Sequence, residues 1–274
     1  MTYTHEEAHI LPSLSFAVRT DRGVRRAVNE DAALALMPSF LVADGMGGHE
    51  AGDLASQAAI AAFAAHIRPG GPSQLGQVGT ALEAAREAVN EVARGRERGA
   101  GCTLSGVILI EYEGELSWLV LNIGDSRVYL HREGELVQLT IDHSLRDEMQ
   151  AEGYTDQELL PARNIITRAL GTASSAADSW ILPVEAGARL LICTDGLTTE
   201  LSDEELCGAL TTGGEPDAVT DDLVDRANDA GGRDNITIVL VDILEEHCNS
   251  LTGDDASEDT LPVGPLPVVY GSRA

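Results

Sequence analysis

Short apolar runs and longer alanine-rich stretches occur in separate blocks along the chain. Runs rich in valine, isoleucine and leucine predict strands, whereas apolar residues three or four apart predict helices. The predicted strands cover about residues 15–18, 32–37, 40–43, 102–112, 116–122, 127–131, 136–139, 178–182, 189–193 and 235–241, and the predicted helices about 52–66, 78–94, 203–210 and 216–229. Because strands and helix pairs are grouped and do not alternate, the pattern favours an α+β fold.

Glycine-containing turns separate the four predicted strands between about residues 102 and 139. The turns are Glu113-Gly114, Gly124-Asp125 and Glu133-Gly134. Such turns are typical of hairpins, so the four strands predict an antiparallel meander. The polar stretch from about 143 to 164 has no clear period and predicts an irregular segment.

The length and composition predict a single domain with two extensions. With 274 residues and 43% hydrophobic content, the chain is long enough to bury one substantial core. Residues 1–12 are polar and form an N-terminal extension, and the domain covers 13–244. Residues 245–274 are acidic and then punctuated by proline, which predicts a disordered tail.

The charge excludes several classes of function. A formal charge of −27 opposes binding to nucleic acid or to an anionic membrane. All 18 basic residues are arginine, which excludes a P-loop lysine and any Schiff-base lysine. No apolar run is long enough to enter a membrane and no signal peptide is recognisable, so we expect a cytoplasmic protein. The four cysteines lack metal-binding spacing, and we expect Cys102 and Cys193 to be buried, reduced thiols.

Five short motifs place chemistry-bearing side chains beside predicted strands. Four of them end or begin a strand with a carboxylate: Arg26 to Asp31, with the pair Glu30-Asp31; Asp44-Gly45-Met46-Gly47-Gly48-His49; Thr194-Asp195-Gly196; and Gly231-Gly232-Arg233-Asp234-Asn235. The fifth, Gly124-Asp125-Ser126-Arg127, is read as a hairpin turn. Each motif alone is ordinary turn or capping chemistry.

The order of the motifs along the chain is more informative than any single motif. If Asp31, Asp44, Asp195 and Asp234 gather at one sheet edge, they repel one another unless cations compensate their charge. Carboxylate and carbonyl oxygens select hard cations, namely Mg²⁺ or Mn²⁺.

Taken in order, these motifs resemble the metal-dependent protein phosphatase family, type 2C, in its short bacterial form. The resemblance covers about residues 15–242 and includes 139–144 and 164–171 between the aspartate motifs. It implies a four-layer α-β-β-α sandwich, with two central antiparallel sheets flanked by helix pairs and a metal channel at one end. Residues 143–163 resemble a flap beside that channel, slightly shorter than in many relatives.

The resemblance also implies roles for single residues. Asp44 would bridge two Mn²⁺ or Mg²⁺ ions, with the Gly45 carbonyl on one ion and Asp195 and Asp234 on the other. Asp31 and Glu30 would support the ions directly or through water. Asp125, with Asp195, would hold a third, weaker ion.

The implied activity is hydrolysis of phosphoserine and phosphothreonine in proteins by a metal-activated water. Arg26 would hold phosphate oxygens through its planar fork, and His49 would protonate the leaving oxygen, with His143 as the competing acid. The partners would be phosphoproteins and a cognate bacterial Ser/Thr kinase; the oligomeric state and the choice between Mn²⁺ and Mg²⁺ stay open.

Three rival functions were weighed against this one. A catalytically silent, metal-loaded binding module conflicts with the intact set of aspartates. A phosphatase dedicated to one regulator, such as an antagonist of an anti-sigma factor, usually carries a fused sensor domain. A plain acidic calcium-binding protein lacks support because the candidate ligands are spread over some 200 residues with no EF-hand pattern.

Overall fold

The computed structural model describes residues 11–47, 51–97, 99–154, 156, 160–161 and 165–244. The strands are β1 Leu14–Asp21, β2 Asp31–Leu36, β3 Ser39–Met46, β4 Gly101–Cys102, β5 Leu104–Tyr112, β6 Glu115–Ile123, β7 Arg127–Arg132, β8 Glu135–Gln138, β9 Asp178–Pro183, β10 Arg189–Cys193 and β11 Ile236–Ile243. The helices are α1 Gly52–His66, α2 Leu75–Ala93, α3 Leu145–Ala151, α4 Asp195–Thr198, α5 Asp203–Thr212 and α6 Pro216–Ala230.

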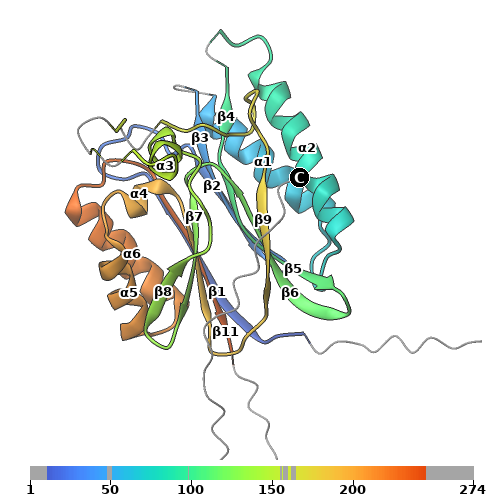
Figure 1. Cartoon of the computed structure of the whole chain (residues 1–274), viewed down its shortest axis with the longest axis vertical. Helices are drawn as coiled ribbons and strands as arrows, with labels where there is room; N and C mark the ends of the chain where they lie inside the picture. The colour runs from blue at the N-terminus through green and yellow to red at the C-terminus, as the bar shows by residue number, and fades with distance from the viewer. Residues whose placement is uncertain are drawn as a thin grey trace, which may run out of the picture.

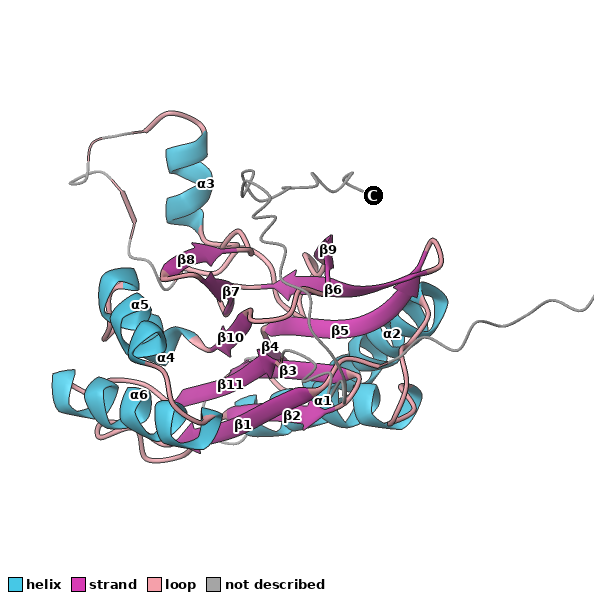
Figure 2. Ribbon diagram, turned by 90° about the horizontal axis from the view of Figure 1, so that it is seen from below, coloured by secondary structure: helices cyan, strands magenta, loops and turns pink. Residues whose placement is uncertain are grey.

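Two antiparallel sheets stack face to face between helices (Figure 1). One sheet has the order β1-β11-β10-β7-β8, and the other has the order β2-β3-β5-β6-β9, with β4 paired to β3. Figure 2 shows α1 and α2 on the outer side of the second sheet and α5 and α6 on the outer side of the first. The predicted four-layer α-β-β-α sandwich is therefore confirmed.

Side chains on alternate positions of the strands fill three separate apolar layers. On β3, Leu41 and Ala43 pack toward α1 and α2, whereas Phe40 and Val42 pack between the two sheets. On β11, Leu240 packs toward α5 and α6 while Val239 and Val241 face the space between the sheets. Strands buried on both faces read as continuous apolar runs, which explains why these segments were recognisable in the sequence.

The sheet register brings four strand ends to one end of the sandwich. Asp31 and Asp44 are direct partners where β2 begins and β3 approaches its end. In the other sheet, β10 runs antiparallel to β11, with Cys193 opposite Ile238. The residues that follow β10 therefore lie beside those that precede β11. The aspartates gather where the two sheets face each other, not along the edge of a single sheet as predicted.

The predicted four-stranded meander is wrong, because its strands divide between the sheets. β5 pairs with β6 and β7 pairs with β8, but β6 pairs next with β9 and β7 with β10. Gly124-Asp125 is consequently a crossing from one sheet to the other and not a hairpin turn. The other two turns are hairpins: Glu113 and Gly114 have φ of 54° and 85°, and Glu133 and Gly134 have 54° and 81°, as type I′ turns require.

The polar stretch predicted to be irregular contains one helix, α3. Ser144 caps it by accepting a hydrogen bond from the Asp147 N–H at 3.1 Å. None of its residues is buried, so it shows no apolar stripe from which a helical period could be recognised.

The two ends of the described domain meet where the Leu244 N–H donates to the Ser13 carbonyl at 2.9 Å. The expected tail, 245–274, and residues 1–10 of the expected extension lie outside the described residues. Within the described part of the chain, no helix has both the length and the apolar character that crossing a bilayer requires. The cytoplasmic location stays a prediction.

Substituting Gly106→Ala tests the close packing of β5 against β3. A Cβ at position 106 would lie 2.1 Å from the Phe40 carbonyl oxygen, so the two strands would have to separate. We expect the free energy of unfolding to fall by about 1–3 kcal/mol in urea titrations. Gly79→Ala in the exposed middle of α2, with open space around its Cβ, should instead raise it by up to about 1 kcal/mol. Equal losses in both variants would contradict this account.

Candidate active site

Two facing aspartates form the part of the site that comes from β2 and β3. Asp31, 8% exposed, opposes Asp44 in the strand register. Thr103 fixes the Asp44 backbone: Thr103 Oγ1 accepts from the Asp44 N–H, and the Thr103 N–H donates to the Asp44 carbonyl, each at 2.9 Å. The backbone of Asp44 is therefore paired on both sides, with Asp31 in β2 and with Thr103.

The other sheet supplies Asp195 and Asp234. Asp195 is the first residue of α4, two positions after the end of β10, and Asp234 lies two positions before the start of β11. A Cβ on Gly196 would lie 1.9 Å from the Asn235 carbonyl oxygen, so only glycine permits this approach of α4 to β11. The glycine of the Asp195-Gly196 motif is thus required by packing next to the carboxylate.

Thr194 joins the two halves of the site. Its hydroxyl donates to Asp31 Oδ2 at 2.9 Å and accepts from the Thr237 N–H at 3.0 Å. Thr194 was not predicted to take part in the site. The only signal for it was a polar residue between an apolar strand and a candidate aspartate.

Asn235 anchors the loop that carries Arg26 and Glu30. Its Oδ1 accepts from the Glu30 N–H at 2.8 Å, and its Nδ2 donates to the carbonyls of Arg22 and Val28 at 2.9 and 3.0 Å. Arg26 Nη2, from the same loop, donates to Asp234 Oδ2 at 2.6 Å, and the Arg26 side chain remains 48% exposed. The guanidinium is therefore held beside the carboxylates and open to solvent.

Gly45 occupies a position with no room for a side chain. A Cβ there would lie 2.1 Å from the Gly52 carbonyl oxygen, and its N–H donates to the Glu30 carbonyl at 3.1 Å. The predicted set Asp31, Asp44, Gly45 and Glu30 is thus adjacent in space. His49 lies outside the described residues, so its role stays a prediction.

Asp125 lies in the crossing between the sheets and is 7% exposed. The residue before it, Gly124, contacts His143, whose ring is 3% exposed. The Gly124 N–H donates to His143 Nδ1 at 3.1 Å, and His143 Nε2 lies 3.1 Å from Asp178 Oδ2. Both ring nitrogens of His143 are therefore engaged by protein groups.

Burial and mutual repulsion raise the pKa values of the clustered carboxyl groups. Burial, followed by the charges of Asp31, Asp195 and other neighbours, raises the pKa of Asp44 well above its usual value. Burial raises the pKa of Asp31 to about 7 despite hydrogen bonds from Thr237 and Thr194 that lower it. Burial and the charge of Asp195 raise the pKa of Asp125 to about 8. A cluster of this kind is costly to ionise without a compensating cation.

The donor set fits a hard divalent cation. Buried oxygens on three of these aspartates, Asp31 Oδ1, Asp125 Oδ1 and Asp195 Oδ1, lack a hydrogen-bond partner within the described residues. Unpaired buried carboxylate oxygens are the ligands that Mg²⁺ and Mn²⁺ take. Among the described residues, no group of three or more His, Cys, Asp or Glu side chains is arranged closely enough to hold a metal ion. The fit therefore rests on the chemistry of the donors and on the unpaired oxygens.

A cavity of about 420 Å³ opens beside the cluster. Asp125, Asp195 and Asp234 line it together with Arg127, Arg233 and residues of α3. Arg127 donates Nη2 to Asp142 at 2.7 Å, and Arg233 donates Nη2 to Glu200 at 2.9 Å, so both arginines are already ion-paired. The cavity is large enough for a phosphorylated side chain to reach the carboxylates.

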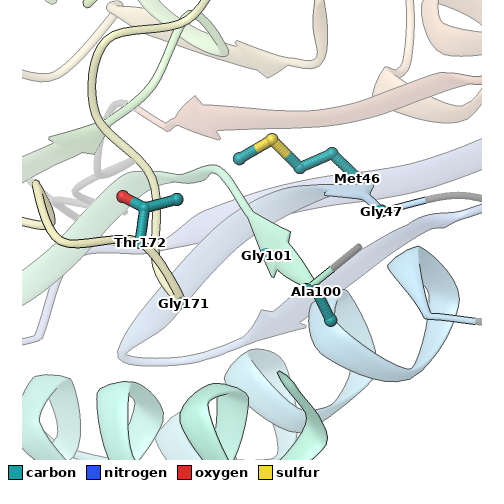
Figure 3. A pocket seen from close by; sticks show the side chains of 7 residues that line it. Met46, Gly47, Ala100, Gly101, Gly171 and Thr172 are labelled. Carbon is teal, nitrogen blue, oxygen red and sulfur yellow. The ribbon is translucent and has the colours of Figure 1, made fainter. Parts of the chain in front are cut away.

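A second hollow of about 190 Å³ lies where β3 ends (Figure 3). Its lining includes Met46, Gly47, Ala100, Gly101, Gly171 and Thr172 and contains no carboxylate, arginine or histidine among the described residues. Asp125, Asp195 and Asp234 of the candidate site therefore line the larger cavity and not this hollow.

The chain is similar to known proteins in sequence and in fold. The family model described as "Protein phosphatase 2C" matches residues 23–241. The serine/threonine protein phosphatase PstP of Mycobacterium tuberculosis (strain CDC 1551 / Oshkosh) is 35% identical over 271 residues, which cover 93% of this chain and 51% of PstP. The chain thus spans about half the length of that relative.

Two further matches extend over nearly the whole length of the protein that is compared. The serine/threonine phosphatase stp of Listeria monocytogenes serotype 4b (strain F2365) is 35% identical over 240 residues, 82% of this chain and 94% of stp. The solved catalytic domain of PstP in complex with two manganese ions superposes with a TM-score of 0.75 at 35% identity and covers 85% of this chain and 99% of that one. On the family match and these identities, the chain belongs to the protein phosphatase 2C family.

Proposed function

We propose that this chain hydrolyses phosphoserine and phosphothreonine monoesters in proteins, with two divalent cations held by its aspartate cluster. The observation that carries the proposal is the group of buried and half-buried aspartates from both sheets beside the exposed guanidinium of Arg26. Three of these aspartates have a buried oxygen with no hydrogen-bond partner among the described residues. Relatives that are 35% identical to the chain over the aligned residues are named serine/threonine phosphatases, and one was solved with two manganese ions.

The candidate metal ligands are Asp44, the Gly45 carbonyl, Asp195 and Asp234, with Asp31 and Glu30 in support. Asp125, together with Asp195, is the candidate for a third and weaker site. The cations, Mn²⁺ or Mg²⁺, supply Lewis-acid activation of the attacking water and neutralise charge on the phosphate. Thr194 and Asn235 contribute by fixing Asp31 and the Glu30 backbone through hydrogen bonds.

Arg26 is the proposed phosphate-binding residue. Its planar fork donates two parallel hydrogen bonds to tetrahedral oxyanions, and these bonds strengthen as negative charge develops in the transition state. One of its nitrogens already contacts Asp234, at 2.6 Å. This contact orients the guanidinium toward the carboxylate cluster, and the exposed remainder of the side chain is open to a phosphate.

The leaving serine or threonine oxygen needs a proton, and His49 remains the proposed donor. His143 is a poor alternative because its ring is 3% exposed and both nitrogens are engaged. With Nδ1 accepting from the Gly124 N–H, the ring can give a proton only from Nε2. That nitrogen lies 3.1 Å from Asp178 Oδ2, so donation to a substrate oxygen would break this contact. We propose phosphorylated proteins as substrates and a cognate Ser/Thr kinase as the enzyme whose action is reversed.

Release of phosphate from a phosphothreonine peptide is the direct test of the proposed activity. We expect turnover with Mn²⁺ or Mg²⁺ and none in EDTA, because the water and the phosphate both depend on the cation. Asp44→Asn and Asp234→Asn should each lose at least about 100-fold in kcat/KM. Asp222→Asn, in an exposed pair with Arg226, should match wild type. Metal-independent turnover, or full activity in both site variants, would overturn the proposal.

The stability of the metal-free protein should increase when one buried charge is removed. Asp44→Asn eliminates a carboxylate whose ionisation is opposed by burial and by neighbouring aspartates. We expect thermal unfolding in EDTA at pH 8 to shift upward by a few degrees, equivalent to about 1–2 kcal/mol. In wild type, added Mn²⁺ should raise the midpoint, and Asp44→Asn should abolish most of that rise. A lower midpoint for Asp44→Asn in EDTA would contradict the repulsion argument.

Replacing Arg26 should impair phosphate binding more than metal binding. We expect Arg26→Ala to lower kcat/KM toward a small phosphomonoester by about 100-fold, and Arg26→Lys to recover only part of the loss, because lysine lacks the planar fork. Calorimetric Mn²⁺ titrations should change by less than about threefold. Arg22→Ala, an exposed arginine in the same loop, is the matched control. A larger loss in Mn²⁺ affinity than in kcat/KM would refute this role.

A further inference from the structure

The direction of the Asp125 side chain depends on the backbone of the crossing between β6 and β7. Gly124 has φ of 112°, a conformation that favours glycine. A Cβ at position 124 would also lie 2.5 Å from the Thr103 side chain. The turn is therefore tightly confined, and a small rotation of its backbone would redirect the Asp125 carboxylate.

His143 contacts this turn through two backbone groups. The Gly124 N–H donates to His143 Nδ1 at 3.1 Å, and the His143 N–H donates to the Gly124 carbonyl at 2.9 Å. Asn122 Nδ2 adds a bond to the same carbonyl at 3.2 Å. The peptide groups that flank Gly124 are thus clamped on both sides by one buried residue.

The contacts of the ring define one tautomer. Because a backbone N–H can only donate, Nδ1 must be unprotonated, and the ring proton is assigned to Nε2. That nitrogen lies 3.1 Å from Asp178 Oδ2 and 3.4 Å from Arg168 Nη1. Asp178 is held in turn by Arg168, whose Nη1 donates to Oδ1 at 3.0 Å. Burial lowers the pKa of His143, with the Asp178 bond opposing it, which favours the neutral ring.

We infer that His143, oriented by Asp178, is the positioning residue for Asp125. Its Nδ1 holds the Gly124 N–H and thereby fixes the turn that aims the Asp125 carboxylate into the cavity. The residue acts through the backbone of the turn and touches neither cation nor phosphate. The inference rests on the proposed role of Asp125 as a ligand of the third cation.

Two amide side chains separate the contributions of the two ring nitrogens. Asparagine places an acceptor oxygen where histidine has Nδ1, so His143→Asn keeps the bond to Gly124 and loses the one to Asp178. Glutamine reaches the position of Nε2, so His143→Gln keeps the bond to Asp178 and loses the one to Gly124. A residue that only fills space would not discriminate between these two variants.

The experiment compares His143→Asn, His143→Gln and His143→Ala by hydrogen exchange of the Gly124 amide in metal-free protein and by calorimetric Mn²⁺ titration. We expect His143→Asn to stay within about threefold of wild type in both. His143→Gln and His143→Ala should speed exchange and weaken the weakest Mn²⁺ step, each by about tenfold or more. His131→Asn, a buried histidine bonded to Thr211 at the far end of β7, is the control and should change neither.

Equal effects of asparagine and glutamine would overturn the inference. Nitrogen chemical shifts of wild-type His143 give a check that needs no variant: a proton on Nδ1 would also overturn it, whereas a proton on Nε2 supports it. If the Gly124 amide exchanges at the same rate in His143→Asn and His143→Gln, the positioning role is refuted even if the enzyme is active. If the wild-type protein releases no phosphate, the proposed function is refuted. Hydrogen exchange of the Gly124 amide still tests the role of His143 in that case.

Discussion

The site depends on the cost of burying several carboxylates close together. Asp31 and Asp125 are buried and Asp44 is half-buried, and the pKa values of all three rise through burial and repulsion by neighbouring carboxylates. Apolar packing does not compensate for this buried negative charge. The compensation must come from a bound cation or from protonation of the carboxylates. The surrounding fold has to be rigid enough to keep these groups together despite that cost, and the rest of the architecture meets this requirement.

Rigidity comes from building the site on strand ends and not on long loops. Asp44 lies within β3, whose outer and inner faces are both packed. Thr194 links Asp31 in one sheet to the Thr237 backbone in the other. Asn235 fastens the Arg26 loop onto β11. Each of these polar bonds joins elements that are far apart in sequence. The packing of the apolar layers keeps these elements in place, and the polar bonds hold the charged end of the sandwich together.

His143 shows how one residue can be interpreted in two ways until its contacts are known. From its motif it was a competing proton donor or a structural histidine with a fixed tautomer. Its burial and its bonds to Gly124 and Asp178 favour the structural role and exclude free access to solvent. The same contacts connect the β6–β7 crossing to the segment before α3, which extends the candidate site beyond the carboxylates themselves.

The sequence alone predicted most of the strands, the two helix pairs and the aspartates of the candidate site. These follow from local periodicity and from a carboxylate next to a buried run, as at Asp44 and Asp195. It could not locate α3, which buries no residue, nor recognise the Gly124-Asp125 crossing, because glycine and aspartate serve a hairpin and a crossing equally well. Thr194, Asn235 and the partners of His143 were also beyond its reach. Only the tertiary structure decided them, because their bonds join residues that are close in space and distant along the chain.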